Sequence, residues 1–250
     1  MTPTLRAVLL GASNLAAALP LAVGLVRHRA GGGPAEVLAA CGRGRSYGAW
    51  SSFLRLRHLP GIAGCGLWPA LERRPSLPTL ALVTDIGNDL VYGAEAATIA
   101  GWVETCLDQL VGQGAEVAIC LIPLARLARL SPWEVRLAVS LLYPGRPAPW
   151  PGLLERAREL DDRLRRLGEA RGARLVEPEA SWYGLDPIHL RRGRRREAWA
   201  RLVGVAEPSA PLRLGRLPRL GAEELRLAGW TRRTPQPAAR LADGTTVALY

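Results

Sequence analysis

Short apolar segments alternate with longer segments of helical periodicity along the first 200 residues. This alternation is typical of βαβ units, in which helices cover a parallel sheet. Five segments have the length and apolar content of buried strands, namely residues 5–10, 36–40, 79–84, 116–122 and 173–176. The third is apolar almost throughout, as a strand covered on both faces requires. The sequence therefore predicts a three-layer α/β/α sandwich around a central parallel sheet of five strands.

Helical patterns fill the intervals between these strands and follow the last one. They predict helices over residues 15–29, 94–113, 153–170 and 192–202. Ser131 and Pro132 resemble an N-cap followed by a first helical residue, and a Pro-rich loop is expected at 143–151. Residues 51–78 are rich in Pro and Gly, with a possible helix over 51–57. We place one domain over residues 1–207 and treat residues 208–250 as a C-terminal extension of uncertain order, with a hairpin around Asp243-Gly244.

The composition limits the compartment and the partners. No run of 18 apolar residues occurs, so no transmembrane span is expected. The apolar N-terminus mimics a signal peptide, but Ser13 and Asn14 interrupt it, and we interpret it as a buried strand and a helix. The four cysteines show no CxxC spacing and predict no disulfide framework. We therefore expect a cytoplasmic protein in a reducing compartment.

The formal net charge of +11 comes from a chain without lysine, so every cationic side chain is arginine. A basic surface can attract nucleic acid or anionic substrates. However, no aromatic residues alternate with the arginines and no nucleic-acid-binding module is recognised, so a solvated face is favoured and no nucleic acid partner is expected. The histidines and cysteines lack ligand spacing, and neither a metal nor a cofactor is predicted.

Four short motifs carry the candidate chemistry, and three of them follow predicted strands. They are Gly11-Ala12-Ser13-Asn14-Leu15, Gly44-Arg45-Ser46-Tyr47-Gly48, Gly87-Asn88-Asp89 and Asp186-Pro187-Ile188-His189. Functional sites of open parallel sheets gather at the carboxyl ends of the strands. The fourth motif lies between the last strand and the closing helix. All four motifs can therefore meet at one edge of the sheet.

The residue types in these motifs suit acyl transfer. Ser13 opens a predicted helix, where its own N–H is free to face an oxyanion and the helix dipole favours negative charge. Of the three histidines, His28 and His58 lie in Arg-rich segments, which are expected at the surface. His189 follows Asp186 by three residues. The turn can direct Asp186 onto one ring nitrogen of His189, which leaves the other nitrogen for Ser13.

In this order the motifs resemble those of the SGNH hydrolases, also called the GDSL esterases and lipases. The resemblance covers roughly residues 5–205 and implies a flavodoxin-like sandwich. It maps the nucleophile onto Ser13, the base onto His189, its orienting acid onto Asp186, and the oxyanion donors onto Ser13, Gly44 and Asn88. Spacing favours Gly44 over Gly42. Two positions depart from the family pattern, because Ala12 replaces the usual Asp and Ile86 replaces a Gly.

The expected function is that of a serine hydrolase that cleaves a small-molecule acyl ester or thioester through an acyl-enzyme. Ser46 and Asp89 are expected to line the substrate pocket. The alternatives are an acyltransferase with the same site, Ser46 as the nucleophile of a G-x-S-x-G elbow, Cys41 as a nucleophile with His189, and a non-catalytic basic binding protein. The oligomeric state is not predicted.

Overall fold

The central sheet contains seven strands in the order β10-β11-β2-β1-β5-β6-β7 in the computed structural model, which describes residues 2–53, 57–131, 133–134, 152–184, 186–208, 217 and 220–250. The strands are β1 (Leu5–Leu10), β2 (Ala35–Ala40), β5 (Thr79–Val83), β6 (Glu116–Cys120), β7 (Arg174–Val176), β10 (Ala239–Arg240) and β11 (Thr246–Leu249). Only the β10–β11 pair is antiparallel. The predicted α/β fold is therefore confirmed, and the order of the five predicted strands is flavodoxin-like.

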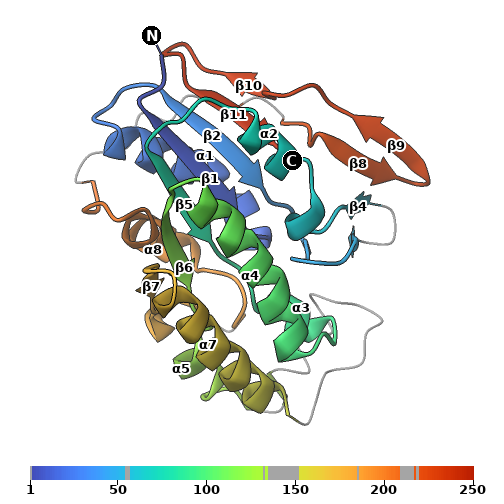
Figure 1. Cartoon of the computed structure of the whole chain (residues 1–250). Helices are drawn as coiled ribbons and strands as arrows, with labels where there is room; N and C mark the ends of the chain where they lie inside the picture. The colour runs from blue at the N-terminus through green and yellow to red at the C-terminus, as the bar shows by residue number, and fades with distance from the viewer. Residues whose placement is uncertain are drawn as a thin grey trace.

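Helices cover both faces of this sheet, because alternate residues of each strand point to opposite sides (Figure 1). Val8 and Leu10 of β1 pack in one hydrophobic cluster with α2 (Leu67–Glu72), α4 (Ala96–Gly112) and α7 (Leu153–Glu169). Ala7 and Leu9 pack in the other cluster with α1 (Ser13–Arg29) and α8 (Arg195–Val203). The predicted helices thus form, within a few residues of the expected ends.

The C-terminal residues make the sheet wider than the five predicted strands. β11 pairs in parallel with β2, and β10 pairs with β11 around Asp243-Gly244, as the predicted hairpin requires. The count of five was too low because the apolar run of β11 is short and its partner lies about 200 residues earlier. Residues 239–249 therefore lie in the same sheet as the strands of residues 5–176.

The helix predicted over residues 51–57 is wrong. β3 (Ser51–Phe53) and β4 (Arg57–Leu59) are antiparallel strands, and they join β8 (Glu224–Leu227) and β9 (Trp230–Arg233) in a second sheet of order β3-β4-β8-β9. Pairing with β8 supplies backbone hydrogen bonds that outweigh a weak local helical preference, and such pairing leaves no local signal in the sequence.

Shorter elements complete the described part of the chain. They are α3 (Asn88–Val91), α5 (Leu124–Leu127) and the 3-10 turns Ile62–Gly64, Ala180–Trp182 and Arg192–Arg194. Ser131 exchanges hydrogen bonds with Glu134, including a bond from the Glu134 N–H to Ser131 Oγ, as an N-cap does. Pro132 and the predicted loop at 143–151 lie outside the described residues. No helix in the described ranges is long and apolar enough to cross a bilayer.

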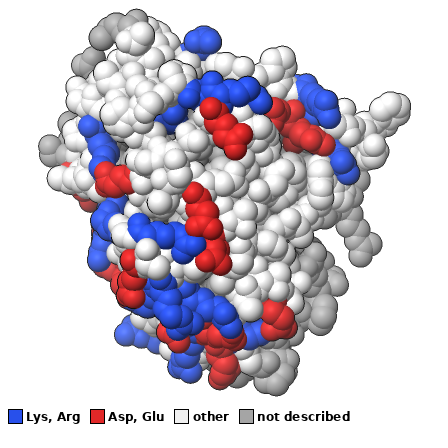
Figure 2. All heavy atoms as spheres, in the orientation of Figure 1, with Lys and Arg blue, Asp and Glu red and all other residues white. Residues whose placement is uncertain are grey.

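Many arginines lie beside acidic side chains on the face shown in Figure 2. Arg171 contacts Glu104 and Asp108 of α4 at 2.9 and 2.7 Å, and Arg165 contacts Asp161 of α7 at 2.8 Å. These ion pairs neutralise part of the positive charge of the arginines.

Candidate active site

Ser13 lies where β1 ends and α1 begins. Gly11 makes the turn between them possible, because a Cβ atom there would lie 2.4 Å from Thr84 Oγ1 at the end of the neighbouring strand β5. Ser13 is half-buried and is the first residue of α1. The described residues provide no backbone acceptor for its N–H, which leaves this donor at the positive end of the helix dipole.

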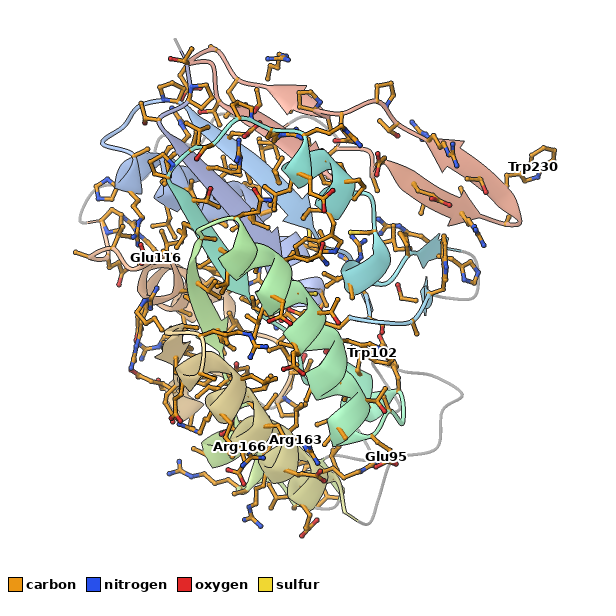
Figure 3. The ribbon with its side chains drawn as sticks, viewed as in Figure 1. Glu95, Trp102, Glu116, Arg163, Arg166 and Trp230 are labelled. Carbon is orange, nitrogen blue, oxygen red and sulfur yellow. The ribbon has the colours of Figure 1, made fainter. Side chains whose placement is uncertain are left out.

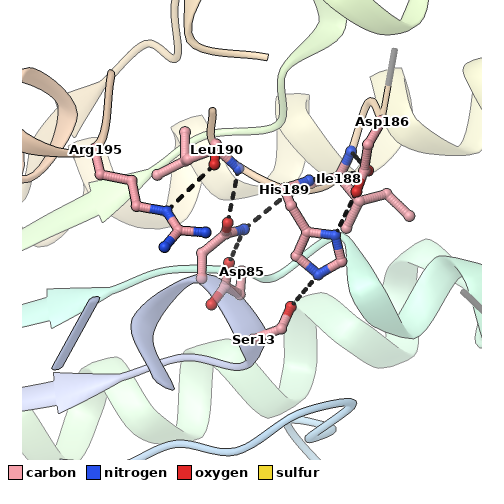
Figure 4. Close-up of polar contacts among 8 residues, drawn as sticks. Ser13, Asp85, Asp186, Ile188, His189, Leu190 and Arg195 are labelled. Atoms are coloured by element: carbon pink, nitrogen blue, oxygen red, sulfur yellow. Dashed lines mark hydrogen bonds and ion pairs between the residues drawn. The ribbon is translucent and has the colours of Figure 1, made fainter. Parts of the chain in front are cut away.

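The turn at residues 186–190 brings His189 onto Ser13 (Figure 4). His189 Nε2 lies 2.9 Å from Ser13 Oγ, and His189 Nδ1 lies 2.7 Å from Asp186 Oδ2. The other carboxylate oxygen, Asp186 Oδ1, accepts the N–H groups of Ile188 and His189 at 2.9 and 3.1 Å. The structure therefore joins the three residues that the sequence singled out, in the hydrogen-bonded order of a Ser-His-Asp triad.

Hydrogen bonds determine the charge state of Asp186. Burial raises the pKa of its carboxyl, but bonds from the His189 ring and from the Ile188 and His189 amides outweigh burial and lower the pKa below its ordinary value. Asp186 is therefore a carboxylate at neutral pH. In this state it fixes the ring of His189 and would stabilise an imidazolium.

Gly44 and Asn88 occupy the next two strand ends, after β2 and β5. Gly44 has a φ of +68° and its carbonyl accepts a hydrogen bond of 2.9 Å from the Tyr92 hydroxyl. Asn88 opens α3, is only 5% exposed, and its Nδ2 has no partner in the described part of the chain. An unpaired buried donor costs free energy and calls for an explanation. A transient oxyanion is such an explanation.

The sequence analysis missed Asp85, which lies close to Ser13. Asp85 is the second residue after β5 and has a φ of +61°, which is rare for a residue other than glycine. Its carboxylate accepts the N–H groups of Ala12 and Leu15 at 2.7 and 3.2 Å, and Asn14 Nδ2 at 2.7 Å. Its place at a strand end, beside the Gly87-Asn88-Asp89 motif, was the available signal.

Ser46 and Asp89 are almost fully buried and bind the backbone of the Gly44–Gly48 loop. Ser46 Oγ accepts the N–H groups of Gly48 and Ala49 at 3.2 and 2.9 Å, and Asp89 accepts the Tyr47 N–H at 2.9 Å. Burial raises the pKa of Asp89, an effect that bonds from Ser46 and Tyr47 reduce without cancelling. Among the described residues no histidine bonds to Ser46, so its geometry does not favour the elbow alternative.

The Gly44–Gly48 loop is held from its other side by α4. A Cβ atom at Gly48 would lie 2.0 Å from the ring of Trp102, which Figure 3 labels on α4.

Cys41, at the end of β2, is buried, and burial raises the pKa of its thiol to about 12. A thiol with such a pKa is not an effective nucleophile at neutral pH.

An apolar cavity of about 120 Å³ begins beside Asn88. Its walls come from the β5–α3 turn, the β6–α5 turn, α7 and the 186–190 turn, with residues such as Leu90, Ile122, Leu127, Leu153 and Pro187. Ser46 and Asp89 are not among its lining residues. Within the described ranges, no group of three His, Cys, Asp or Glu side chains could hold a metal ion.

Comparison with solved structures shows which known fold this chain has. No sequence-family model matches the chain, and neither does any curated protein. Among solved structures, the inhibitor-bound M. smegmatis aryl esterase aligns over 80% of this chain and 97% of its own, with a TM-score of 0.50 and 14% identity. The chain has the fold of that esterase.

Two further structures show weaker similarity. A carbohydrate acetylesterase family member from Sinorhizobium meliloti aligns over 80% of this chain and all of its own, with a TM-score of 0.49 and 16% identity. AlinE4, an SGNH-hydrolase family esterase, aligns over 70% of this chain and 77% of its own, with a TM-score of 0.43 and 20% identity. At such low identities, function has to be argued from the site.

Proposed function

We propose that this chain is a divergent SGNH hydrolase, a serine esterase that cleaves acyl esters or thioesters. The observation that carries the proposal is the continuous hydrogen-bonded series from Asp186 through His189 to Ser13. A nucleophile with its base within 3.2 Å, and a base oriented by a carboxylate, is the geometry of nucleophilic acyl transfer. The sequence resemblance assigns the same residues to the same roles.

The reaction begins when Ser13 Oγ attacks the acyl carbon while its proton passes to His189 Nε2. The carbonyl oxygen becomes an oxyanion, which the N–H groups of Ser13 and Gly44 and the Asn88 side chain stabilise. The alcohol or thiol leaves with the proton from His189. A water molecule, deprotonated by His189, then attacks the acyl-enzyme, and collapse of the second intermediate releases the acid and restores Ser13.

Two features of the site support this mechanism, one concerning the oxyanion and one concerning the substrate. The Nδ2 of Asn88 is a buried donor without a partner among the described residues, and an oxyanion in the site would supply one. The apolar cavity beside Asn88 gives room for an apolar part of the substrate. Because few polar groups line it, a charged part of the substrate would be buried there without a partner. We therefore expect uncharged esters to be turned over faster than esters that carry a charge on the acyl chain.

Labelling with a fluorophosphonate and turnover of p-nitrophenyl acetate test this proposal. We expect the wild type and Ser46→Ala to label and turn over, whereas Ser13→Ala loses the label and at least about 10³-fold in turnover. Labelling and turnover that survive in Ser13→Ala but vanish in Ser46→Ala would support the elbow alternative instead. A folded wild type that neither labels nor hydrolyses a panel of esters would favour the non-catalytic alternative.

A further inference from the structure

We infer that Asn14 is a positioning residue for the proposed reaction, an amide latch that holds the turn bearing His189 against the helix that bears Ser13. The inference rests on the proposed function and goes beyond it, because the triad assignment gives Asn14 no role. It also gives Asp85 a role, as the group that orients the latch.

The Asn14 side chain binds both neighbours of His189. Its Nδ2 donates to the Ile188 carbonyl at 3.0 Å, and its Oδ1 accepts the Leu190 N–H at 2.9 Å (Figure 4). Among the described residues, these two bonds and the His189–Ser13 bond are the hydrogen bonds that join the 186–190 turn to α1. The bonds from Ile188 and His189 to Asp186 are internal to the turn and cannot fix its distance from Ser13.

Asp85 fixes which way the amide points. Asp85 Oδ1 accepts a second hydrogen bond from Asn14 Nδ2, at 2.7 Å, so the nitrogen of the amide faces two acceptors and its oxygen faces a donor. The same carboxylate accepts the Ala12 and Leu15 amides, on both sides of Ser13 and Asn14. One connected network therefore holds the backbone around the nucleophile and the backbone around the base.

An amide is the side chain that matches this arrangement. A carboxylate at position 14 would have the same shape, but it would place an acceptor against the Ile188 carbonyl and a second negative charge against Asp85. Reacting groups have to be held close to their productive geometry, and a displacement of about 1 Å can cost 10²-fold in rate. A turn freed from the latch would lose this precision while its own fold persists.

The isosteric variant Asn14→Asp tests the latch through the split between kcat and KM. We expect kcat for p-nitrophenyl acetate to fall about 10²-fold with KM changed by no more than about threefold. The 186–190 turn forms only one wall of the cavity, so binding of a small ester depends less steeply on its position than proton transfer to His189 does. In the double variant Asn14→Asp with Asp85→Asn, amide and carboxylate exchange places, so the bond between the two positions returns, while the acceptor for the Leu190 N–H is present in both variants. We expect kcat to recover at least about tenfold.

Gln236 provides a matched control. Its side-chain nitrogen donates to the Gly221 and Thr234 carbonyls at 3.1 and 3.2 Å, and its oxygen accepts the Leu249 N–H at 2.8 Å. This is the same pattern of two donated bonds and one accepted bond, in the C-terminal region and outside the site. We expect both Gln236→Glu and Asn14→Asp to lower the urea midpoint, and we expect kcat to stay at the wild-type value in Gln236→Glu alone.

The outcomes separate the latch from the proposed function. If the wild type is active, Ser13→Ala is inactive and Asn14→Asp keeps kcat within about twofold, the latch is refuted and the esterase proposal stands. Equal losses of kcat in Asn14→Asp and Gln236→Glu would reduce Asn14 to a structural residue. If Asn14→Asp does not fold, Asn14→Ala removes all three bonds of the Asn14 side chain without adding a second carboxylate, and the same criteria apply. An inactive wild type refutes both proposals.

Discussion

Asn88→Ala should separate activity from stability in this chain. The Asn88 side chain is buried, and its Nδ2 has no hydrogen-bond partner among the described residues. In the proposed reaction this group meets its partner only when the oxyanion forms. Removing it should therefore slow the reaction and at the same time relieve the free protein of an unsatisfied donor.

The structure sets the size of both effects. The loss of one oxyanion donor costs about 10²- to 10³-fold in kcat, or roughly 2.7–4 kcal/mol of transition-state stabilisation. A buried unsatisfied donor costs about 1–3 kcal/mol, and the packing lost with the carboxamide offsets about 1 kcal/mol of that gain. We therefore expect the free energy of unfolding to rise by about 0–2 kcal/mol, which corresponds to an increase in Tm of up to roughly 8 °C for a chain of this size.

Turnover of p-nitrophenyl acetate and urea unfolding on the same preparations measure both quantities. Gln236→Ala is the contrasting control, because the Gln236 amide makes three hydrogen bonds, so that its nitrogen and its oxygen both have partners. It should lose stability and keep kcat, the reverse of Asn88→Ala. The reasoning fails if Asn88→Ala retains kcat/KM within about threefold of wild type, or if its free energy of unfolding falls by more than about 2 kcal/mol.

Two further predictions concern the loops behind the site. Because burial raises the pKa of Asp89 in the folded protein, the folded state binds more protons, and stability should decline as pH rises from the unfolded pKa of about 3.9 through the folded pKa; Asp89→Asn should abolish that decline in urea midpoints measured between about pH 4 and 7. Gly44→Ala places a Cβ atom 2.9 Å from the Tyr92 hydroxyl at a φ of +68°, so both Tm and kcat should fall. Gly31→Ala has the same φ of +68° and no atom within 4 Å. Strain of about 1–2 kcal/mol should lower its Tm and leave kcat unchanged.

The central strands and the hydrogen bonds from Asp186 through His189 to Ser13 could be predicted because their signals are local. β1 is an apolar run with a turn after it, and the helical periodicity after Ser13 shows that a helix follows. Parallel strands joined by helices place their carboxyl ends at one edge, so the sequence alone predicts that Ser13, Gly44 and Asn88 follow strands at the same edge of the sheet. Asp186 and His189 are three residues apart, and a turn is enough to pair them.

The remaining elements depend on partners that are distant in the sequence. β11 pairs with β2, and β4 pairs with β8, across more than 160 residues in each case. A strand of three or four residues has little periodicity, and which strand it pairs with is decided by packing in the folded chain. The predicted pocket role of Ser46 was drawn from its place beside Gly44, and sequence position cannot tell which of two neighbouring residues faces a cavity.

The departure at position 12 is understandable from Asp85. In the SGNH pattern that the sequence resembles, an aspartate stands at this position, whereas here Ala12 is fully buried and its N–H binds the Asp85 carboxylate at 2.7 Å. An aspartate side chain at position 12 would place a second carboxylate close to the half-buried Asp85, and two like charges so close cannot both stay ionised without a large cost. Ala12 and Asp85 are therefore compatible as a pair. A carboxylate still supports the start of α1 in this chain, but it is supplied by the end of β5, where the same group can also orient Asn14.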